Sequence, residues 1–444
     1  MTTSAQWSYT TLTQDKARLG SASLGTKGYF AGGEDPQGLQ IAEVQVYDVE
    51  LEDWDTIINL SVPRSHPACA AAGGKIFFAG GTNLTIPLMF DDIDVWNTVT
   101  HQWDPLMNLM FPRVTYALGY GNKVLFAGGI DFEMGIVHDI VEIYDVETEQ
   151  WSYTQLSLAR AAFAYAVVGD LAIFAGGFTF SPLNPITDQV DIYNFTTDTW
   201  STAKLSTPRG FLAAATVGTK VLIAGGVNPD NTLSKRVDIY DAATNSWSID
   251  SLSGPRAMFQ DDATTICGEL AYFAGGGTFD LNYMGWMENS DVIDIYNNVE
   301  GTWSVDYLPE PVNQHAVAGV GDHFIAAGGF GVDGVPIFTV GIYKCLWCGS
   351  DEESAVGGQQ SAVRFYPNPT GGIVDCQLSI VDCRRVSLKL YDCQGKEIMI
   401  LFEGSLPVGE QTIRFDISGL PAGIYYYRLL TADGRLLTGK IVKL

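Results

Sequence analysis

A pair of adjacent glycines that follows a short apolar run recurs seven times in the first three quarters of the chain. The first glycine of each pair follows its predecessor by 48, 48, 48, 49, 50 and 53 residues. Such a regular period predicts one structural unit repeated seven times, each packed against its neighbours. The pairs are Gly32-Gly33, Gly80-Gly81, Gly128-Gly129, Gly176-Gly177, Gly225-Gly226, Gly275-Gly276 and Gly328-Gly329.

A second repeated feature follows each of the first six glycine pairs: an aromatic residue with a tryptophan seven positions later. The pairs are Tyr47 and Trp54, Trp96 and Trp103, Tyr144 and Trp151, Tyr193 and Trp200, Tyr240 and Trp247, and Tyr296 and Trp303. Each period reads as four strands: an apolar run such as 211–217, a run that ends in the glycine pair, an alternating run such as 237–240, and a run that carries the tryptophan. Four strands per period of about 50 residues predict an all-β fold, a β-propeller.

The glycine pair followed by the spaced tyrosine and tryptophan resembles the kelch repeat. This resemblance covers about residues 1–345 and implies a seven-bladed kelch-type β-propeller. Kelch propellers serve many functions, so the resemblance says little about activity.

The seventh repeat reaches Tyr343, but position 350 is a serine where the tryptophan is expected, and no fourth strand follows. Trp7 stands before the first repeat without a glycine pair of its own. We therefore expect the N-terminal strand to complete the last blade, which leaves no unpaired sheet edge at the closure. Six complete blades and a frayed seventh are the alternative.

The charge of the chain is unevenly distributed and indicates two domains. Up to residue 360 there are 15 basic and 43 acidic residues, a net charge of −28, whereas the remainder carries 10 basic and 8 acidic residues. The polar stretch 349–361 is rich in glycine and serine and predicts a linker. We expect a propeller over 1–348, this linker, and a small C-terminal β-sandwich over 362–444.

The C-terminal segment resembles the type A sorting domain of proteins exported by the type IX secretion system of Bacteroidota. The matching features are a Tyr-Pro-Asn-Pro opening, a Leu-Tyr-Asp-x-x-Gly turn, a Gly-Leu-Pro-Ala-Gly-Ile-Tyr run and a Lys-Ile-Val-Lys end. The resemblance implies a partner, the type IX secretion machinery, and export through the periplasm and outer membrane to the medium or the cell surface. Its motif residues here are Tyr366, Pro367, Asn368, Pro369, Gly395, Gly423, Lys440 and Lys443.

Export of this kind also requires a Sec signal peptide, and residues 1–6 have neither the basic start nor the apolar core of one. We therefore expect that the signal peptide is not present in this chain. The sequence contains no run of about 18 apolar residues, so we expect no transmembrane helix. The net charge of −26 repels phosphate backbones and argues against nucleic acid as a partner.

Residues with catalytic chemistry are sparse. Copper radical oxidases resemble the chain in blade count, but no set of histidines, tyrosine and cysteine with a copper-site pattern aligns here, so we expect neither a metal site nor another cofactor. His66 and His315 precede the innermost strands of the second and seventh blades, which places both near the channel mouth. They are candidate ligand-binding residues, or else isolated polar residues.

Arginine recurs just ahead of the innermost strand in six blades and is missing only from the seventh, at Val312-Asn313. A ring of arginines near the axis is a candidate ligand site; alternatively, each arginine satisfies backbone carbonyls between blades. The pattern itself favours the structural role, because it repeats. The residues are Arg18, Arg64, Arg113, Arg160, Arg209 and Arg256, of which Arg64, Arg113, Arg209 and Arg256 are carried forward as ligand-binding candidates.

The loops between the second and third strands lie on the same end of the propeller as the arginines and are acidic and aromatic. Trp286, in the longest of them, has no place in the repeat and is a candidate anchor for a ligand. We therefore expect a secreted or surface-attached propeller that binds a protein or a glycan. The alternative is a secreted carbohydrate-active enzyme, such as a copper radical oxidase, with its site at the channel mouth.

Overall fold

The computed structural model describes the chain in two units, Met1–Cys345 and Leu346–Leu444, and each is considered by itself. The residues expected to form the linker, 349–361, lie outside the described residues. In the described part of the chain, no helix has the length and hydropathy needed to cross a membrane. The described residues are 6–83, 89–181, 185–259, 262–282, 285–345, 363–366, 372–380, 386–391, 397–404, 409–421, 423–431 and 436–443.

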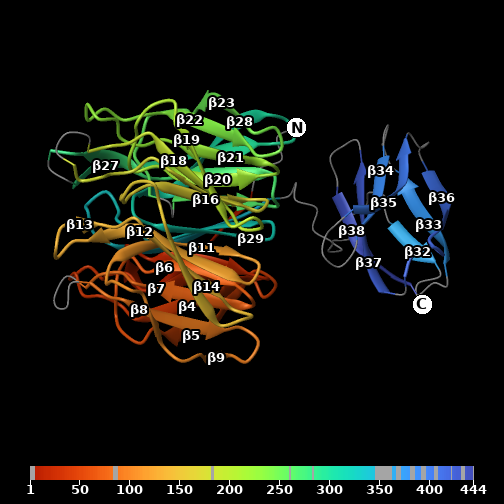
Figure 1. Ribbon diagram of the computed structural model, residues 1–444, viewed down its shortest axis with the longest axis horizontal. Coiled ribbons are helices and arrows are strands. Elements are labelled where there is room, and N and C mark those ends of the chain that lie inside the picture. The colour runs from red at the N-terminus through yellow and green to blue at the C-terminus, as the bar shows by residue number, and fades with distance from the viewer. Residues whose placement is uncertain are drawn as a thin grey trace. The chain divides into compact units, whose positions relative to one another are not determined.

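The first unit is a seven-bladed propeller (Figure 1), and each blade is an antiparallel sheet of at least four strands. The first blade contains β2 (Gly20–Leu24), β3 (Lys27–Ala31), β4 (Glu43–Asp48) and β5 (Asp53–Asn59). The second contains β6 (Ala68–Ala72), β7 (Lys75–Ala79), β8 (Asp92–Asn97), β9 (Gln102–Trp103) and β10 (Met107–Asn108). The third contains β11 (Val114–Tyr120), β12 (Lys123–Asp131), β13 (Ile136–Val137), β14 (Ile140–Asp145) and β15 (Gln150–Gln155).

The remaining blades follow the same plan. The fourth contains β16 (Ala164–Val168), β17 (Leu171–Ala175), β18 (Gln189–Asn194) and β19 (Thr199–Lys204). The fifth contains β20 (Ala213–Val217), β21 (Lys220–Ala224), β22 (Arg236–Asp241) and β23 (Ser246–Ser251). The sixth contains β24 (Ala263–Ile266), β25 (Leu270–Ala274), β26 (Gly277–Asp280), β27 (Gly285–Asn297) and β28 (Thr302–Val312). The seventh contains β29 (Ala316–Val320), β30 (His323–Ala327), β31 (Ile337–Lys344) and the N-terminal strand β1 (Gln6–Lys16).

The N-terminal strand closes the ring. β1 pairs antiparallel with β31, so the outermost strand of the seventh blade comes from the opposite end of the propeller sequence. Trp7 lies directly opposite Tyr343 in this pairing, and their ring centroids are 5.4 Å apart. Trp7 thus supplies the tryptophan that the seventh repeat lacks, and the hydrogen bonds of β1 and β31 hold the ring together.

The repeated aromatic residue and tryptophan are cross-strand partners on the third and fourth strands of a blade. Tyr193 and Trp200 are opposite one another, with ring centroids 5.0 Å apart. The indole Nε1 of Trp200 also donates to Thr154 Oγ1 in the preceding blade at 2.8 Å. The pair therefore stabilises its own sheet and ties it to its neighbour. The aromatic residue and the tryptophan are seven residues apart because the chain needs that length to turn from one paired position to the other across the hairpin.

The two ends of the propeller differ. At one end, the connection that enters each innermost strand bridges to the start of the loop between the second and third strands, as Ala161 does to Phe178 and Gly210 to Val227. We call this end the loop face; in Figure 1 the hairpin of β27 and the short β13 project from it. The other end, which carries the tight turns after the first and third strands, is the turn face. The connections of the loop face are 32–42, 80–91, 132–139, 176–188, 225–235, 275–291 and 328–336, of which 132–139 includes β13 and 275–291 includes β26 and the start of β27; we call them its loops.

The second unit is a small β domain of two sheets around one core. One sheet has the order β32 (Val363–Tyr366), β33 (Ile373–Ile380), β36 (Gly409–Asp416), and the other the order β35 (Glu397–Gly404), β34 (Val386–Tyr391), β37 (Gly423–Thr431), β38 (Leu436–Lys443). Val374 and Cys376 of the first sheet pack with Leu388, Leu390 and Ile441 of the second. Tyr366, Gly423, Lys440 and Lys443 of the expected sorting motif lie on these strands, whereas Pro367, Asn368, Pro369 and Gly395 lie outside the described residues.

Candidate functional site

Beneath the loop face, six blades bury a basic side chain ahead of the innermost strand and pair it with an acidic side chain on the third strand. The basic side chains are between 0% and 4% exposed. The pairs are Lys16 with Glu43, Arg64 with Asp94, Arg113 with Glu142, Arg160 with Asp191, Arg209 with Asp238, and Arg256 with Asp294. The first-blade member is Lys16, so the prediction from sequence that Arg18 belongs to this ring is wrong.

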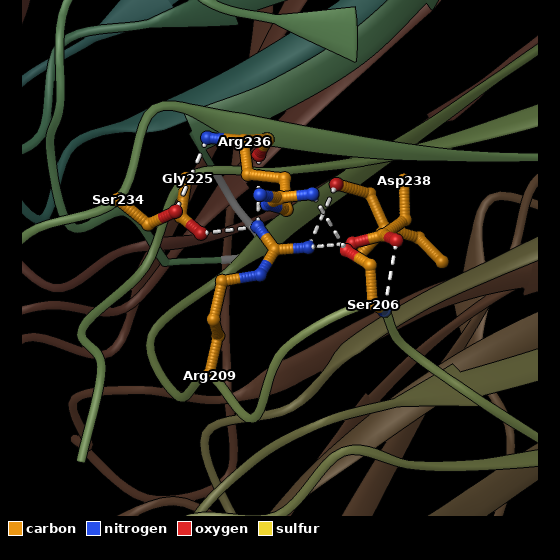
Figure 2. A network of polar contacts seen from close by, with 7 residues as sticks. Ser206, Arg209, Gly225, Ser234, Arg236 and Asp238 are labelled. Carbon is orange, nitrogen blue, oxygen red and sulfur yellow. Dashed lines mark hydrogen bonds and ion pairs between the residues drawn. The ribbon is translucent and has the colours of Figure 1, made fainter. Parts of the chain in front are cut away.

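The fifth blade shows how the two terminal nitrogens of such a side chain are bound (Figure 2). Arg209 Nη1 donates to the carbonyl oxygens of Gly225 at 2.6 Å and Arg236 at 2.8 Å, while Nη2 donates to Asp238. Asp238 accepts a further hydrogen bond from the backbone N–H of Ser206 at 2.9 Å. Burial lowers the pKa of Arg209 to about 10, against the opposing attraction of Asp238, so the guanidinium stays protonated at neutral pH.

The backbone of each arginine also joins two blades. The carbonyl oxygen of Arg209 accepts a hydrogen bond from the N–H of Gly177 in the preceding blade at 2.8 Å. A Cβ on the adjacent Gly176 would lie 2.5 Å from the same carbonyl oxygen, and both glycines have positive φ angles. The repeated glycine pair is therefore required by the close approach of the next blade's arginine.

These contacts do not support a ligand-binding role for Arg64, Arg113, Arg209 and Arg256. Their side chains lie in the protein interior and their charges are neutralised by acidic partners there. A ligand would have to displace a buried carboxylate to reach them. Breaking such a buried ion pair typically costs about 3–5 kcal/mol of folding free energy. The ring is an architectural feature that lies under the candidate site.

The seventh blade has lost both members of the pair together. Val312 occupies the arginine position and Gly341 the acidic position on β31. A Cβ on Gly341 would lie 3.0 Å from the Trp7 ring, so the closing strand fills the space that a carboxylate takes elsewhere. A buried charge without its partner would be costly, which explains why both members are absent together.

In five of the seven blades, the residue two positions after the buried basic residue, or after Val312 in the seventh blade, turns the chain at the mouth of the axis with a positive φ angle. The residues are Arg18, His66, Ala162, Phe211 and Gln314, with φ between 48° and 60°. Backbone hydrogen bonds link consecutive members: Arg18 N–H donates to the Gln314 carbonyl at 3.0 Å, and His66 N–H to the Arg18 carbonyl at 2.9 Å. We call these five residues the belt. Their side chains surround the mouth, and the type of side chain differs from blade to blade.

His66 lies in this belt, as the sequence indicates. Its ring is 6.3 Å from that of Phe259, although the two residues belong to the second and sixth blades, so their side chains meet across the mouth. Burial, followed by the positive charge of Arg18, lowers the pKa of His66 to about 3. The imidazole is therefore neutral at physiological pH, and its Nδ1 is buried without a hydrogen-bond partner.

His315 does not reach the mouth. It is one position further along the repeat than His66, and its ring is fully buried between the sixth and seventh blades. Its Nδ1 lies 3.1 Å from Asp262 Oδ1, and the side chains of both residues are 0% exposed. The sequence prediction of His315 as a ligand-binding residue is therefore not supported, because its position in the blade is already occupied by internal contacts.

Arg18 is the basic residue of the belt, and its guanidinium is already paired with a carboxylate. Nη1 donates to Glu34 at 2.9 Å and Nε donates to Gln314 Oε1 at 2.9 Å. The guanidinium carbon also lies 5.2 Å from the centre of the Phe330 ring. With its charge balanced by Glu34, Arg18 holds the first and seventh blades together at the mouth.

On the opposite side of the mouth, aromatic side chains from three blades form one cluster. The Phe211 ring is 4.2 Å from Phe279 and 5.3 Å from Phe259, and Trp286 is 5.6 Å from Phe259 and 5.5 Å from Phe279. Phe178 joins through Phe211 at 4.9 Å. Phe259 and Trp286 are half-buried, so one part of each ring packs on the cluster and the other part is accessible. We call these five residues the aromatic cluster.

Below the mouth, the axis holds a cavity of about 170 Å³ lined by small and hydroxyl-bearing side chains. Ser21, Ser23, Thr264 and Tyr165 are among its lining residues. Within the described residues, no three histidine, cysteine, aspartate or glutamate side chains are placed to hold a metal ion. The mouth thus offers a neutral imidazole, a balanced ion pair and an aromatic surface.

Comparison with known proteins agrees with this architecture. Residues 364–443 match the secretion system C-terminal sorting domain, and residues 63–110 and 208–249 match the kelch motif. The chain therefore carries kelch repeats on a seven-bladed propeller and a sorting domain at its C-terminus. The sorting domain implies export to the medium or the cell surface.

The relatives of the kelch propeller are distant. Two F-box/kelch-repeat proteins of Arabidopsis thaliana match parts of it: one is 29% identical over 72 residues, 16% of this chain and 19% of its own length. The other, SKIP11, is 38% identical over 63 residues, 14% of each chain. The matches thus span less than a fifth of either relative. The structure of YjhT superposes with a TM-score of 0.51 at 16% identity, over 67% of this chain and 99% of that one, which shows the shared fold alone.

Proposed function

We propose that the protein is an exported binding module that recognises a protein or a glycan at the loop face of its kelch propeller. The observation that carries this proposal is the aromatic cluster, because it departs from the repeat and leaves parts of Phe259 and Trp286 accessible. Aromatic rings that are held rigidly and half-exposed supply large contact areas at a low entropic cost, both to sugars and to protein anchors.

The proposal is tested by presenting the full chain to an array of glycans and bacterial surface proteins, beside a Trp286→Ala variant. We expect the parent to retain one class of ligand and Trp286→Ala to lose it. Tyr153→Ala is the matched control, because Tyr153 is 54% exposed on β15, outside the aromatic cluster. Equal binding by the parent and Trp286→Ala would remove the cluster from the site.

We further propose that the sorting domain engages the type IX secretion machinery of a Bacteroidota bacterium and carries the propeller across the outer membrane. The match over residues 364–443 supports this. Residues 362–444, fused behind a Sec-exported reporter, should bring that reporter to the surface or medium of a type IX-competent bacterium. The reporter without the tail is the control. Retention of the fusion in the periplasm would count against the assignment.

A further inference from the structure

The loop face carries exposed apolar side chains at the tips of most of its loops. Among the described residues, Phe132 is 59% exposed, Met134 71%, Met287 59% and Val332 74%. Leu39 and Phe180, on the first and fourth loops, are 57% and 46% exposed. These side chains lie at the same end of the propeller as the aromatic cluster, and exposed apolar side chains of this kind are what protein partners cover.

The same face carries little accessible positive charge: Lys204, 70% exposed at the end of β19, pairs with Asp188, and Arg236 at the start of β22 is half-buried. Six of its seven loops contain no lysine or arginine, and Lys235 in the fifth loop is the exception. The basic residues that enter the innermost strands are buried in the ring of ion pairs, and Arg18 is paired with Glu34. Acidic residues are spread over the loops: Asp35, Asp91, Glu133, Asp139, Asp188, Asp230, Asp280, Glu288, Asp291 and Asp333.

The turn face differs, because four of the second strands begin there with a lysine. These are Lys27, Lys75, Lys123 and Lys220. Lys27 and Lys75 form ion pairs with Asp55 and Asp104. Since the buried pairs are neutral as units, the propeller's net charge, 15 basic against 40 acidic residues over residues 1–345, lies on its surface, and among the described residues most of the loop-face carboxylates have no lysine partner.

We propose that the loop face docks a basic, partly apolar segment of a protein partner, with lysine or arginine side chains against the loop carboxylates and apolar side chains on the aromatic cluster. This inference rests on the proposed function and specifies its ligand. Charge complementarity selects this partner, because the acidic loops repel nucleic acid and acidic glycans, and a neutral glycan leaves the charges unused. The exposed tips of Phe132, Met134 and Met287 extend the contact beyond the few rings that a sugar covers.

The test uses the full chain and a fluorescent 12-residue peptide that alternates lysine and leucine around one tryptophan, read by anisotropy. We expect binding that weakens about tenfold between about 50 mM and about 300 mM NaCl, because exposed charges are screened. A peptide with glutamate in place of lysine, and another with serine in place of leucine, should each bind at least about tenfold more weakly.

Matched charge reversals locate the site. Glu133→Lys with Asp333→Lys changes two exposed loop-face residues, and Glu50→Lys with Glu300→Lys makes the same change in net charge on the turn face. We expect about a tenfold loss of peptide affinity for the loop-face variant and less than about a twofold loss for the turn-face variant. Both variants should keep the parent's melting temperature within a few degrees, since surface substitutions usually have small effects on stability.

Several results would overturn the inference: equal weakening by the two double variants, equal binding of the glutamate peptide, or no binding of the lysine peptide. If a glycan or neutral protein from the array instead binds in a Trp286-dependent way and ignores the loop-face reversal, the proposed function stands and the basic partner is wrong. If nothing in either experiment depends on Trp286 or on the loop charges, both proposals fail.

Discussion

The ring of buried ion pairs and the loop face above it are built from the same repeat and obey different rules. In the ring, the same residue types return in five blades, with Lys16 in place of arginine in the first. On the loop face, the belt position holds arginine, histidine, alanine, phenylalanine and glutamine in different blades. The difference shows that regular recurrence in this propeller marks architecture, whereas departure from the repeat marks the surface available for recognition.

The largest expected effect comes from removing the strand that closes the ring. Deletion of residues 1–12 removes the part of β1 that pairs with Thr339 to Lys344 and takes Trp7 from Tyr343. The exposed edge of β31 should lead to aggregation or to a much lower melting temperature. Scattering and thermal unfolding check this, and unchanged melting and solubility would contradict closure by β1.

Loss of one ring member should be the next largest effect. Arg209→Ala leaves the Asp238 carboxylate buried without its cation, and we expect a loss of about 3–5 kcal/mol in the free energy of unfolding. Arg209→Leu with Asp238→Ala imitates the apolar seventh blade and should recover much of that loss. Denaturant unfolding of both variants measures the difference, and a double variant as unstable as Arg209→Ala would contradict the comparison with Val312 and Gly341.

The pH dependence of stability should reflect His66 at the mouth. Its pKa is lowered to about 3 in the folded state, whereas an unfolded histidine titrates near 6.5. The unfolded chain therefore binds more protons below that pH, so stability is lost as the pH falls. His66 alone should contribute at most about 2 kcal/mol of this loss at pH 5. His66→Gln should reduce the slope of unfolding free energy against pH between 7.5 and 5; an unchanged slope would contradict the buried, neutral imidazole.

The smallest effect on stability should come from the loop tips. Phe132→Ser and Met134→Ser change side chains that are 59% and 71% exposed, and each should alter the free energy of unfolding by less than about 0.5 kcal/mol. The same variants should weaken binding of the lysine-leucine peptide. Thermal unfolding beside anisotropy separates the two properties, and a large loss of stability would show that these tips pack internally.

The architecture was predictable because its signals repeat. Seven glycine pairs give the blade count, and Trp7 standing alone indicates where the missing strand comes from. The ring was predictable only in part: arginine recurs visibly, but Lys16 fills the first blade with a different residue and Arg18, two positions on, suggested the wrong alignment. The carboxylates that fix the arginines lie some 30 residues away on the third strand, so their pairing emerges only in the folded blade.

The candidate site was harder to foresee because it has no repeat. Trp286 drew attention by its absence from the pattern, yet its partners Phe259 and Phe279 come from different segments of the sixth blade and Phe211 from the fifth. The sequence predicts an anchor in the loop there, and the structure shows a half-buried ring. Only the closing of the ring brings these aromatic side chains together and places His66 against Phe259 across the mouth.

The separation of architecture from recognition is tested most directly by measuring folding and ligand binding together in Arg209→Ala and Trp286→Ala. We expect Arg209→Ala to be strongly destabilised but still to bind the array ligand at temperatures where it remains folded. Trp286→Ala should lose about 1–3 kcal/mol, since a half-buried ring contributes part of a full burial, and should lose binding. If Arg209→Ala instead melts like the parent and no longer binds, the ring of buried ion pairs is itself the ligand site, and architecture and recognition are not separate in this propeller.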